Sequence, residues 1–244
     1  MSRLAVIGGT GLNKLVDLKD VYKRVIKTPY GEPSSPLTFG KLNGIDLVFM
    51  ARHGYGHTIP PHRINYRANM WALKDAGATD IVAVAAVGSL NIEMEPGSIV
   101  LPDQLIDYTW GRESTYFEDD LEQVTHIDFT FPYSPKLVAE LRMAMVTAGL
   151  PVLDNAVYGC TQGPRLETAA EIRKLGRDGC DLVGMTGMPE AALARELKLN
   201  YACCATVVNW AAGLNGNEIS MADIEVHAKK GMLQLDQLLK ALIK

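Results

Sequence analysis

Short, uninterrupted apolar runs alternate with longer helical patterns along this chain, and this alternation limits the possible fold more than any other feature. Six runs rich in Val, Ile and Ala are candidate strands: residues 3–9, 46–52, 80–88, 97–102, 181–186 and 201–209. Strands that lack polar alternation are typical of a sheet covered by helices on both faces. The sequence therefore predicts an α/β protein with a largely buried sheet.

Five segments have the period expected of helices: 64–76, 135–148, 166–177, 188–197 and 221–243. The last one begins at Ser220 and Asp223, which have the spacing of a capping box, and its apolar stripe starts at Met221. No repeat, low-complexity tract or charged linker divides the chain, so we expect residues 1–244 to form one domain. The long irregular stretches 28–36 and 103–134 are candidate functional loops.

Charge and hydropathy argue against several classes of function. The formal net charge of −4 gives no general attraction to nucleic acid or to an anionic membrane surface. No apolar run approaches the roughly 18 residues of a membrane span, and the apolar stretch in residues 1–9 is too short for a signal-peptide core. The four cysteines lack C-x-x-C spacing, and Cys203 and Cys204 lie in an apolar run. We expect a reduced, cytoplasmic protein with buried thiols.

Polar residues follow the first two candidate strands, at the edge where α/β sheets bind ligands. Residues 8–11 read Gly-Gly-Thr-Gly, whose N–H groups and Thr10 hydroxyl suit a phosphate, although an ordinary tight turn also uses glycines. Arg52 and His53 follow the second candidate strand. Arg52 has the forked donor geometry for a phosphate or for a structural carboxylate, and both interpretations stay open.

Two later motifs also end in polar residues. Met185 and Thr186 end the strand candidate at 181–186; Thr186 can bond a phosphate oxygen, and Met185 can pack on a sugar or in the core. An earlier Gly-Pro turn leads Leu166 and Glu167 into the predicted helix 166–177, where a glutamate is also an ordinary N-terminal cap. No H-x-x-x-H or H-E-x-x-H pattern is present, so we predict no metal site.

In their order and spacing, six motifs resemble the purine nucleoside phosphorylase / methylthioadenosine phosphorylase family. They are IGGTGL (7–12), ARHG (51–54), NYRANMWALK (65–74), VGSL (87–90), QGPRLET (162–168) and GMTGMPEAALARE (184–196). The strand that ends at Asn209 matches as well, and the resemblance covers nearly the whole chain. It implies a single α/β domain with a mixed, partly barrel-like central sheet flanked by helices. It also implies a homotrimer that cleaves purine nucleosides with inorganic phosphate, without metal or organic cofactor.

The resemblance carries over to individual residues. It implies a phosphate site made of Thr10, Arg52, His53, Ala86 and Thr186. It implies that the nucleoside contacts Met185, Leu166 and Ala211, with Met185 under the ribose and Leu166 in place of a phenylalanine often found against the base. His126 matches a histidine that the family lends to the active site of a neighbouring subunit, near the 5′ substituent.

Glu167 and Asn209 predict which base is recognised. A 6-oxopurine presents an acceptor at O6 and a donor at N1, so an ionised Glu167 can accept from N1–H while the Asn209 amide donates to O6 or N7. Members of the family that act on 6-aminopurines have serine and aspartate at these two positions. A buried polar pair of this kind discriminates strongly because the wrong base leaves groups unpaired. We therefore expect a 6-oxopurine, with Asn209 stabilising the departing base.

Met221 and Ile224 predict which sugar is recognised. Members that cleave inosine and guanosine have a histidine for the 5′-hydroxyl where Met221 stands, and Ile224 lies on the same helical face. An apolar, polarisable pocket favours a 5′-methylthio group. Packing of both residues in the core, and a match displaced by one residue across the loop 214–218, are the alternatives.

The chain is therefore expected to convert methylthioinosine and phosphate into hypoxanthine and 5-methylthioribose 1-phosphate. Phosphorolysis of methylthioadenosine or of inosine and guanosine is the alternative within the same class. A hydrolase of the same fold and a nucleoside-binding protein without catalysis are alternatives from other classes. The retained phosphate motifs argue against simple binding, because a binding protein needs no phosphate site.

Overall fold

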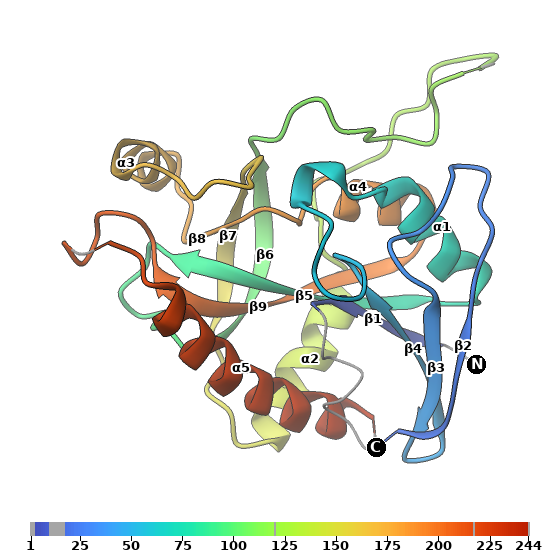
Figure 1. Ribbon diagram of the computed structural model, residues 1–244, viewed down its shortest axis with the longest axis horizontal. Coiled ribbons are helices and arrows are strands. Elements are labelled where there is room, and N and C mark those ends of the chain that lie inside the picture. The colour runs from blue at the N-terminus through green and yellow to red at the C-terminus, as the bar shows by residue number, and fades with distance from the viewer. Residues whose placement is uncertain (1–2, 10–17, 120, 217, 244) are drawn as a thin grey trace.

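A single mixed sheet forms the centre of the computed structural model, which describes residues 3–9, 18–119, 121–216 and 218–243 (Figure 1). Across these residues the strands are β1 (Leu4–Gly8), β2 (Lys19–Arg24), β3 (Leu37–Leu42), β4 (Ile45–Ala51), β5 (Asp80–Ser89), β6 (Ile99–Asp107), β7 (Asp154–Cys160), β8 (Leu182–Gly184) and β9 (Asn200–Trp210). The helices are α1 (Tyr66–Asp75), α2 (Pro135–Thr147), α3 (Ala169–Arg177), α4 (Glu190–Glu196) and α5 (Met221–Leu242), with a 3₁₀ turn at Pro61–Arg63.

The sheet closes on itself over part of its width. Its strand order is β2-β3-β4-β1-β5-β8-β7-β6-β9, and β9 also pairs with β5, so five strands form a barrel and four extend from it. β1 is parallel to β4 and β5, β5 is parallel to β9, and β8 and β6 run antiparallel to their partners β5 and β9. The predicted mixed, partly barrel-like sheet is confirmed. Because β1, β4, β5 and β9 share one direction, their carboxyl ends face the same side.

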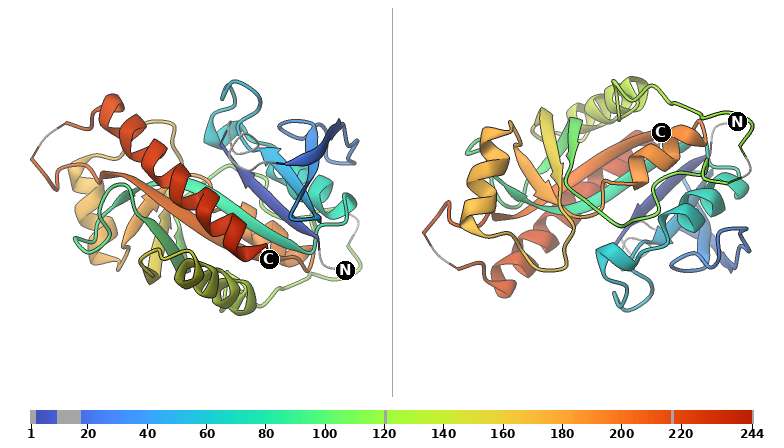
Figure 2. Two further views of the ribbon diagram at one scale, coloured as in Figure 1. Left: turned by 90° about the horizontal axis from the view of Figure 1, so that it is seen from below. Right: turned by 90° about the horizontal axis from the view of Figure 1, so that it is seen from above.

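Helices cover the sheet on opposite sides. In Figures 1 and 2, α2 and α5 lie below the long strands β5 and β9, while α1, α3 and α4 lie above them. Leu235, Leu238 and Leu239 of α5 are fully buried. All four cysteines are free and buried, as predicted for Cys203 and Cys204. Within the described ranges, no helix is long and apolar enough to cross a membrane.

All six predicted strands and all five predicted helices are present, but several bounds were wrong. The predicted strand 97–102 continues to Asp107 because it pairs with β7 as far as Cys160. The predicted helix 166–177 begins only at Ala169, because Thr168 caps it and Glu171 completes a capping box. Glu167 therefore precedes the helix, and the cap role considered for it belongs to Glu171.

Three strands were not predicted: β2, β3 and β7. Every residue of β2 is exposed, and its sequence KDVYKR has the charges of a sheet edge and not an apolar run. β3 (LTFGKL) and β7 (DNAVYGC) contain polar residues and glycine, which lower strand propensity. At Gly159 of β7, a Cβ would lie 2.9 Å from the Sγ atom of Cys180, so close packing requires glycine there.

The space around two helical glycines, Gly231 of α5 and Gly176 of α3, predicts opposite effects of alanine substitution on stability. A Cβ at Gly231 would lie 2.0 Å from the Cγ2 atom of Thr206, whereas at Gly176 of α3 its nearest neighbour is 3.8 Å away. We expect Gly231→Ala to lower the free energy of unfolding by about 1–3 kcal/mol through overpacking. Gly176→Ala should raise it by about 0.5–1 kcal/mol by reducing backbone freedom in the unfolded chain. Urea denaturation measures both, and equal effects would contradict the packing described.

Candidate active site

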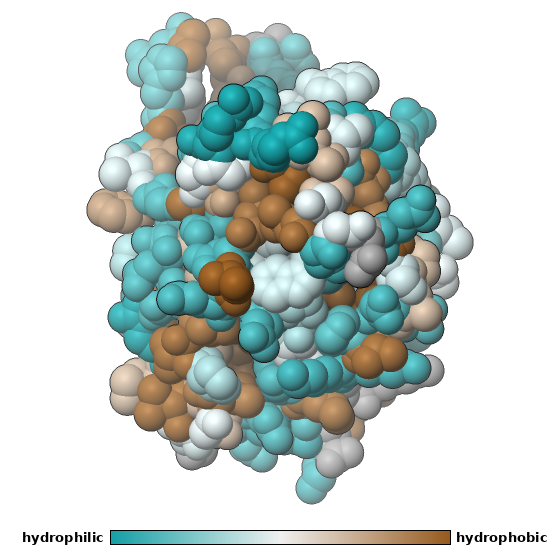
Figure 3. All heavy atoms as spheres, turned by 90° about the vertical axis from the view of Figure 1, so that its left-hand side faces the viewer, coloured by the Kyte–Doolittle hydropathy of each residue, from teal (hydrophilic) through white to brown (hydrophobic). Residues whose placement is uncertain are grey.

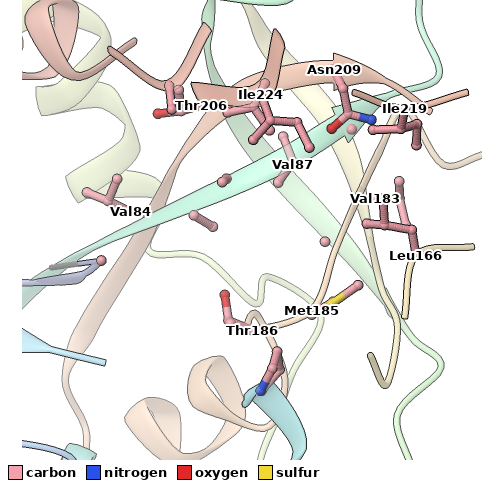
Figure 4. Close-up of a pocket in the computed structure, with 18 of the residues that line it drawn as sticks. Val84, Val87, Leu166, Val183, Met185, Thr186, Thr206, Asn209, Ile219 and Ile224 are labelled. Atoms are coloured by element: carbon pink, nitrogen blue, oxygen red, sulfur yellow. The ribbon is translucent and has the colours of Figure 1, made fainter. Parts of the chain in front are cut away.

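A cavity of about 510 Å³ opens at the carboxyl ends of the parallel strands, beside the first turns of α5 (Figure 4). Its lining contains nearly every residue that the sequence singled out: Arg52, His53, Ala86, Leu166, Glu167, Met185, Thr186, Asn209, Ala211, Met221 and Ile224. In Figure 4, Asn209 and Ile224 lie along the upper side and Met185 and Thr186 along the lower side. The fold therefore brings together side chains from six separate parts of the chain.

Two predicted residues need separate mention. Thr10 lies outside the described residues, and its neighbour Gly9 lines the cavity. His126 is exposed in the segment 108–134, away from the lining of its own chain's cavity. Its predicted role concerns the cavity of a neighbouring subunit, so it stays a prediction.

Arg52 forms a buried ion pair with Glu190 at the first position of α4. Its Nε and Nη2 atoms each donate to one carboxylate oxygen at 2.7 Å, and the two side chains are 2 % and 0 % exposed. Nη1 and Nη2 also donate to the carbonyl oxygens of Val84 and Ile7, and the Tyr201 hydroxyl donates to Glu190. Burial disfavours the charged guanidinium, but the adjacent carboxylate outweighs it and raises the pKa of Arg52 above its ordinary value.

The structural carboxylate considered from the sequence is thus Glu190. Arg52 has five N–H groups, and the bonds to Glu190, Val84 and Ile7 use four of them. Arg52 also lines the cavity. One Nη1 N–H is therefore left for a ligand, instead of the bidentate fork that the sequence suggested.

His53 stands beside Arg52 as a neutral imidazole. Its Nδ1 atom lies 2.8 Å from the carbonyl oxygen of Ile59, which can only accept, so Nδ1 carries the proton and Nε2 carries the lone pair. Burial and the charge of Arg52 lower the pKa of His53 to about 4, and His57 stacks on it with ring centroids 4.3 Å apart. Because the His53 ring is uncharged and the charge of Arg52 is balanced by Glu190, this end of the cavity is polar but only weakly cationic.

The loop after β8 places Met185 and Thr186 against the cavity. Thr186 is buried, and its N–H group lies 3.4 Å from the Tyr158 hydroxyl. At Gly184 a Cβ would lie 2.2 Å from that same hydroxyl, so only glycine permits this close approach. Ala86 is exposed within an otherwise buried part of β5, because it faces the cavity.

Asn209 and Glu167 both line the cavity, and both are held by local bonds. The Asn209 Nδ2 atom donates to the Trp210 carbonyl at 2.7 Å, which orients the amide and leaves its second N–H and its oxygen for a ligand. Glu167 accepts a 2.6 Å bond from the Thr161 hydroxyl on one carboxylate oxygen. A donor amide and a carboxylate acceptor are thus available at the same cavity.

A register shift in the pairing of β9 with β5 brings Asn209 to this position. Val87 pairs with Val207 but Gly88 pairs with Asn209, so Val208 is an extra residue on β9. Thr206 and Val208 line the cavity on the ordinary alternation, and the bulge lets Asn209 line it too.

The end of the cavity at α5 is mostly apolar. Met221, Ile224, Ala228 and Met232 line it from the helix, and Ile219 precedes them. Met221 is 67 % exposed and Ile224 is half-buried, so core packing does not account for their position. The Thr206 hydroxyl also lines this end, buried and without a hydrogen-bond partner.

Sequence reasoning missed Arg112, which connects the loops around the cavity. Its Nη1 atom donates to the carbonyls of Met185 and Met188, and its Nη2 atom donates to those of Thr161 and Gln162. Arg112 lies in the irregular stretch predicted to be functional, but no local pattern marks it as a contact of these loops. In the part of the chain that the structure describes, no group of three or more His, Cys, Asp or Glu side chains is arranged to hold a metal ion.

Comparisons with known proteins match nearly the whole of this chain. Residues 3–244 match the family model described as the phosphorylase superfamily. A protein of Pseudomonas syringae pv. tomato named probable S-methyl-5′-thioinosine phosphorylase is 55 % identical over 232 residues, covering 95 % of this chain and 94 % of the relative. The 6-oxopurine nucleoside phosphorylase of Pyrococcus furiosus is 45 % identical over 240 residues, covering 94 % and 88 %. The crystal structure of a methylthioadenosine phosphorylase from an antarctic soil metagenomic library superposes with a TM-score of 0.93 at 37 % identity, covering 99 % of this chain and 85 % of that one.

The buried ion pair predicts a large effect on stability. We expect Glu190→Gln to lower the free energy of unfolding by about 3–5 kcal/mol, because the Arg52 charge would stay buried without a compensating charge. Arg165→Gln is the matched control, since it removes the exposed Arg165–Glu171 pair and should change stability little. Denaturant unfolding of both variants gives the comparison, and similar losses would show that burial of the pair is unimportant.

Proposed function

The chain belongs to the phosphorylase superfamily, and from that premise we propose that it cleaves S-methyl-5′-thioinosine with inorganic phosphate. The products are hypoxanthine and 5-methylthioribose 1-phosphate, which makes the enzyme a pentosyltransferase. The observation that carries this assignment is that one cavity is lined both by the polar pair Glu167 and Asn209 and by the apolar residues Met221 and Ile224.

Recognition of the base follows from the polar pair. The free oxygen of the Glu167 carboxylate accepts from N1–H of the purine, and the second N–H of Asn209 donates to O6 or N7. Adenine has the opposite pattern of donors and acceptors at these two positions, because its N1 accepts and its N6 amino group donates. A site made to pair with one edge rejects the other by a large factor, since its buried groups are left unpaired.

The reaction breaks one bond and forms another at C1′. As the bond between C1′ and N9 lengthens, the ribosyl ring becomes positive and the bonding electrons pass to the purine. A phosphate oxygen beneath the sugar stabilises the cation and then bonds to C1′. Asn209 stabilises the negative purine at N7, which accelerates the reaction only because the amide is already oriented by Trp210.

We assign the phosphate to Thr10, Arg52, His53, Ala86 and Thr186, and the ribose to Met185. Four of these five phosphate residues line the cavity, which supports the assignment. Because Arg52 is largely occupied by Glu190, its remaining N–H acts together with Thr186 and backbone N–H groups, and the lone pair on His53 Nε2 accepts from a protonated phosphate oxygen. No cofactor takes part, and phosphate is a co-substrate.

The sugar end favours a 5′-methylthio group. Met221, Ile224 and Met232 offer a hydroxyl no hydrogen-bond partner, whereas a thioether packs against them without that cost, and the Thr206 hydroxyl is the polar group described at this end. The relative from Pseudomonas syringae carries the matching name, and the relative from Pyrococcus furiosus is named for 6-oxopurines. The structural neighbour is named for methylthioadenosine, which keeps that substrate as the second candidate.

The proposed enzyme is a cytoplasmic homotrimer in which His126 reaches the neighbouring cavity. Exposed apolar side chains support an association surface: Trp110 is 72 % exposed, and Val124 and Phe131 are also exposed in the segment 108–134. Figure 3, which shows the left-hand side of Figure 1, has hydrophobic patches between hydrophilic ones. Four buried free thiols suit a reducing compartment.

Comparison of three nucleosides tests the proposal. In phosphate buffer, kcat/KM for methylthioinosine should exceed that for methylthioadenosine by about 10²-fold or more, because adenine mismatches both polar groups. It should exceed that for inosine by about tenfold, the scale of one apolar contact. Faster cleavage of methylthioadenosine would overturn the base assignment, and equal use of inosine would overturn the sugar assignment. Release of base without phosphate would instead indicate a hydrolase.

Exchange of the polar pair provides an independent test. The double variant Asn209→Asp with Glu167→Ser should lose activity on 6-oxopurines and gain it on 6-aminopurines, moving the ratio by about 10²-fold. Glu140→Ser, on the exposed face of α2, is a control that should leave the ratio unchanged. A double variant with the original preference would mean that other contacts select the base.

A further inference from the structure

Thr161 lies behind Glu167 and donates to it, and we propose that this hydroxyl is a positioning residue that sets base selectivity. It fixes the Glu167 carboxylate in place as an acceptor, and so makes the site select purines that carry a proton on N1. The proposal rests on the proposed function, because it assigns a second residue to the recognition of the same base.

The bond between the two side chains has the geometry of a charged pair. The Thr161 Oγ1 atom lies 2.6 Å from the Oε1 atom of Glu167. Distances of about 2.5–2.7 Å are typical of a hydroxyl that donates to a carboxylate, and such bonds are stronger than those between neutral groups. The bond occupies Oε1 and leaves Oε2 for the ligand. Thr161 itself is not among the described residues that line the cavity, so it acts through Glu167.

The backbone around Thr161 is fixed from both sides. Its N–H group donates to the Gly184 carbonyl at 2.8 Å, directly after the pairing of β7 with β8. Its own carbonyl accepts from the Nη2 atom of Arg112 at 3.3 Å. The hydroxyl has one other acceptor within reach, the Gly184 carbonyl at 3.3 Å. Because the carboxylate is nearer and charged, the Thr161 hydroxyl donates its hydrogen bond to Glu167.

The consequence for selectivity follows from the position of the carboxylate. A 6-oxopurine donates from N1–H and pairs with an acceptor that is held in place, whereas the N1 atom of an adenine is itself an acceptor and is mismatched with it. The Thr161 hydroxyl holds the Glu167 carboxylate through a charge-assisted bond. Without that bond, the carboxylate is free to turn away from N1, so the 6-oxopurine loses its partner and the penalty for binding an adenine falls.

Two variants at one position separate this role from a structural one. Thr161→Val keeps the shape of the side chain and removes the donor, whereas Thr161→Ser keeps the donor. For each variant, kcat/KM is measured with methylthioinosine and with methylthioadenosine, and the binding of hypoxanthine and adenine is measured by calorimetry in phosphate. The binding measurement keeps the test decisive when catalysis is weak.

We expect Thr161→Val to lower the preference for the 6-oxopurine by roughly ten- to hundredfold, the range of a lost hydrogen bond to a charged group. Thr161→Ser should keep the wild-type preference. An unchanged preference in Thr161→Val, including an equal loss with both substrates, would overturn the proposal. Failure of the proposed function is seen separately, because the wild-type protein would then show no preference for methylthioinosine.

Discussion

The buried pair of Arg52 and Glu190 is the interaction on which the rest of the site depends. Arg52 follows β4 and bonds to carbonyls of β1 and β5, while Glu190 begins α4 and accepts from Tyr201 of β9. One ion pair thus connects four parallel strands to the helix above them. Two charges that are buried together must keep their geometry, because separation would leave each without compensation. The four strands are therefore held in one arrangement around Arg52, which itself lines the cavity.

A second set of contacts, made by Arg112, holds the loops beside the cavity. Among the residues that the structure describes, Arg112 has no carboxylate as a hydrogen-bond partner and instead binds backbone carbonyls of two loops, one leading to Glu167 and one carrying Met185. Thr161 belongs to the first of these loops and bonds to Glu167. Among the described residues, polar groups that line the cavity are thus oriented by groups outside its lining, which is the arrangement expected of a preorganised site.

The sequence predicted the fold class and most of the cavity because the relevant residues stand directly at strand ends. Arg52, Met185 and Asn209 each follow or end an apolar run. Parallel strands bring the ends of β4 and β9 together, whereas Met185 joins them because the short strand β8 pairs antiparallel with the end of β5. The partner of Arg52 was not predictable, since Glu190 lies 138 residues away and looks like an ordinary first-turn glutamate. Arg112 and Thr161 were missed for the same reason, because their contacts are set by tertiary packing. β2 was missed because an exposed, charged edge strand has no hydrophobic pattern.

The bulge at Val208 makes the proposed selectivity depend on strand register as well as on residue identity. Asn209 pairs with Gly88 because β9 has one more residue than β5 over the same length. If the same strand were paired without the bulge, Gly88 would pair with Val208, and strict alternation would turn the Asn209 amide to the face opposite that of Thr206. A shift of register in β9 is therefore a route to new base preferences that keeps every residue of the strand.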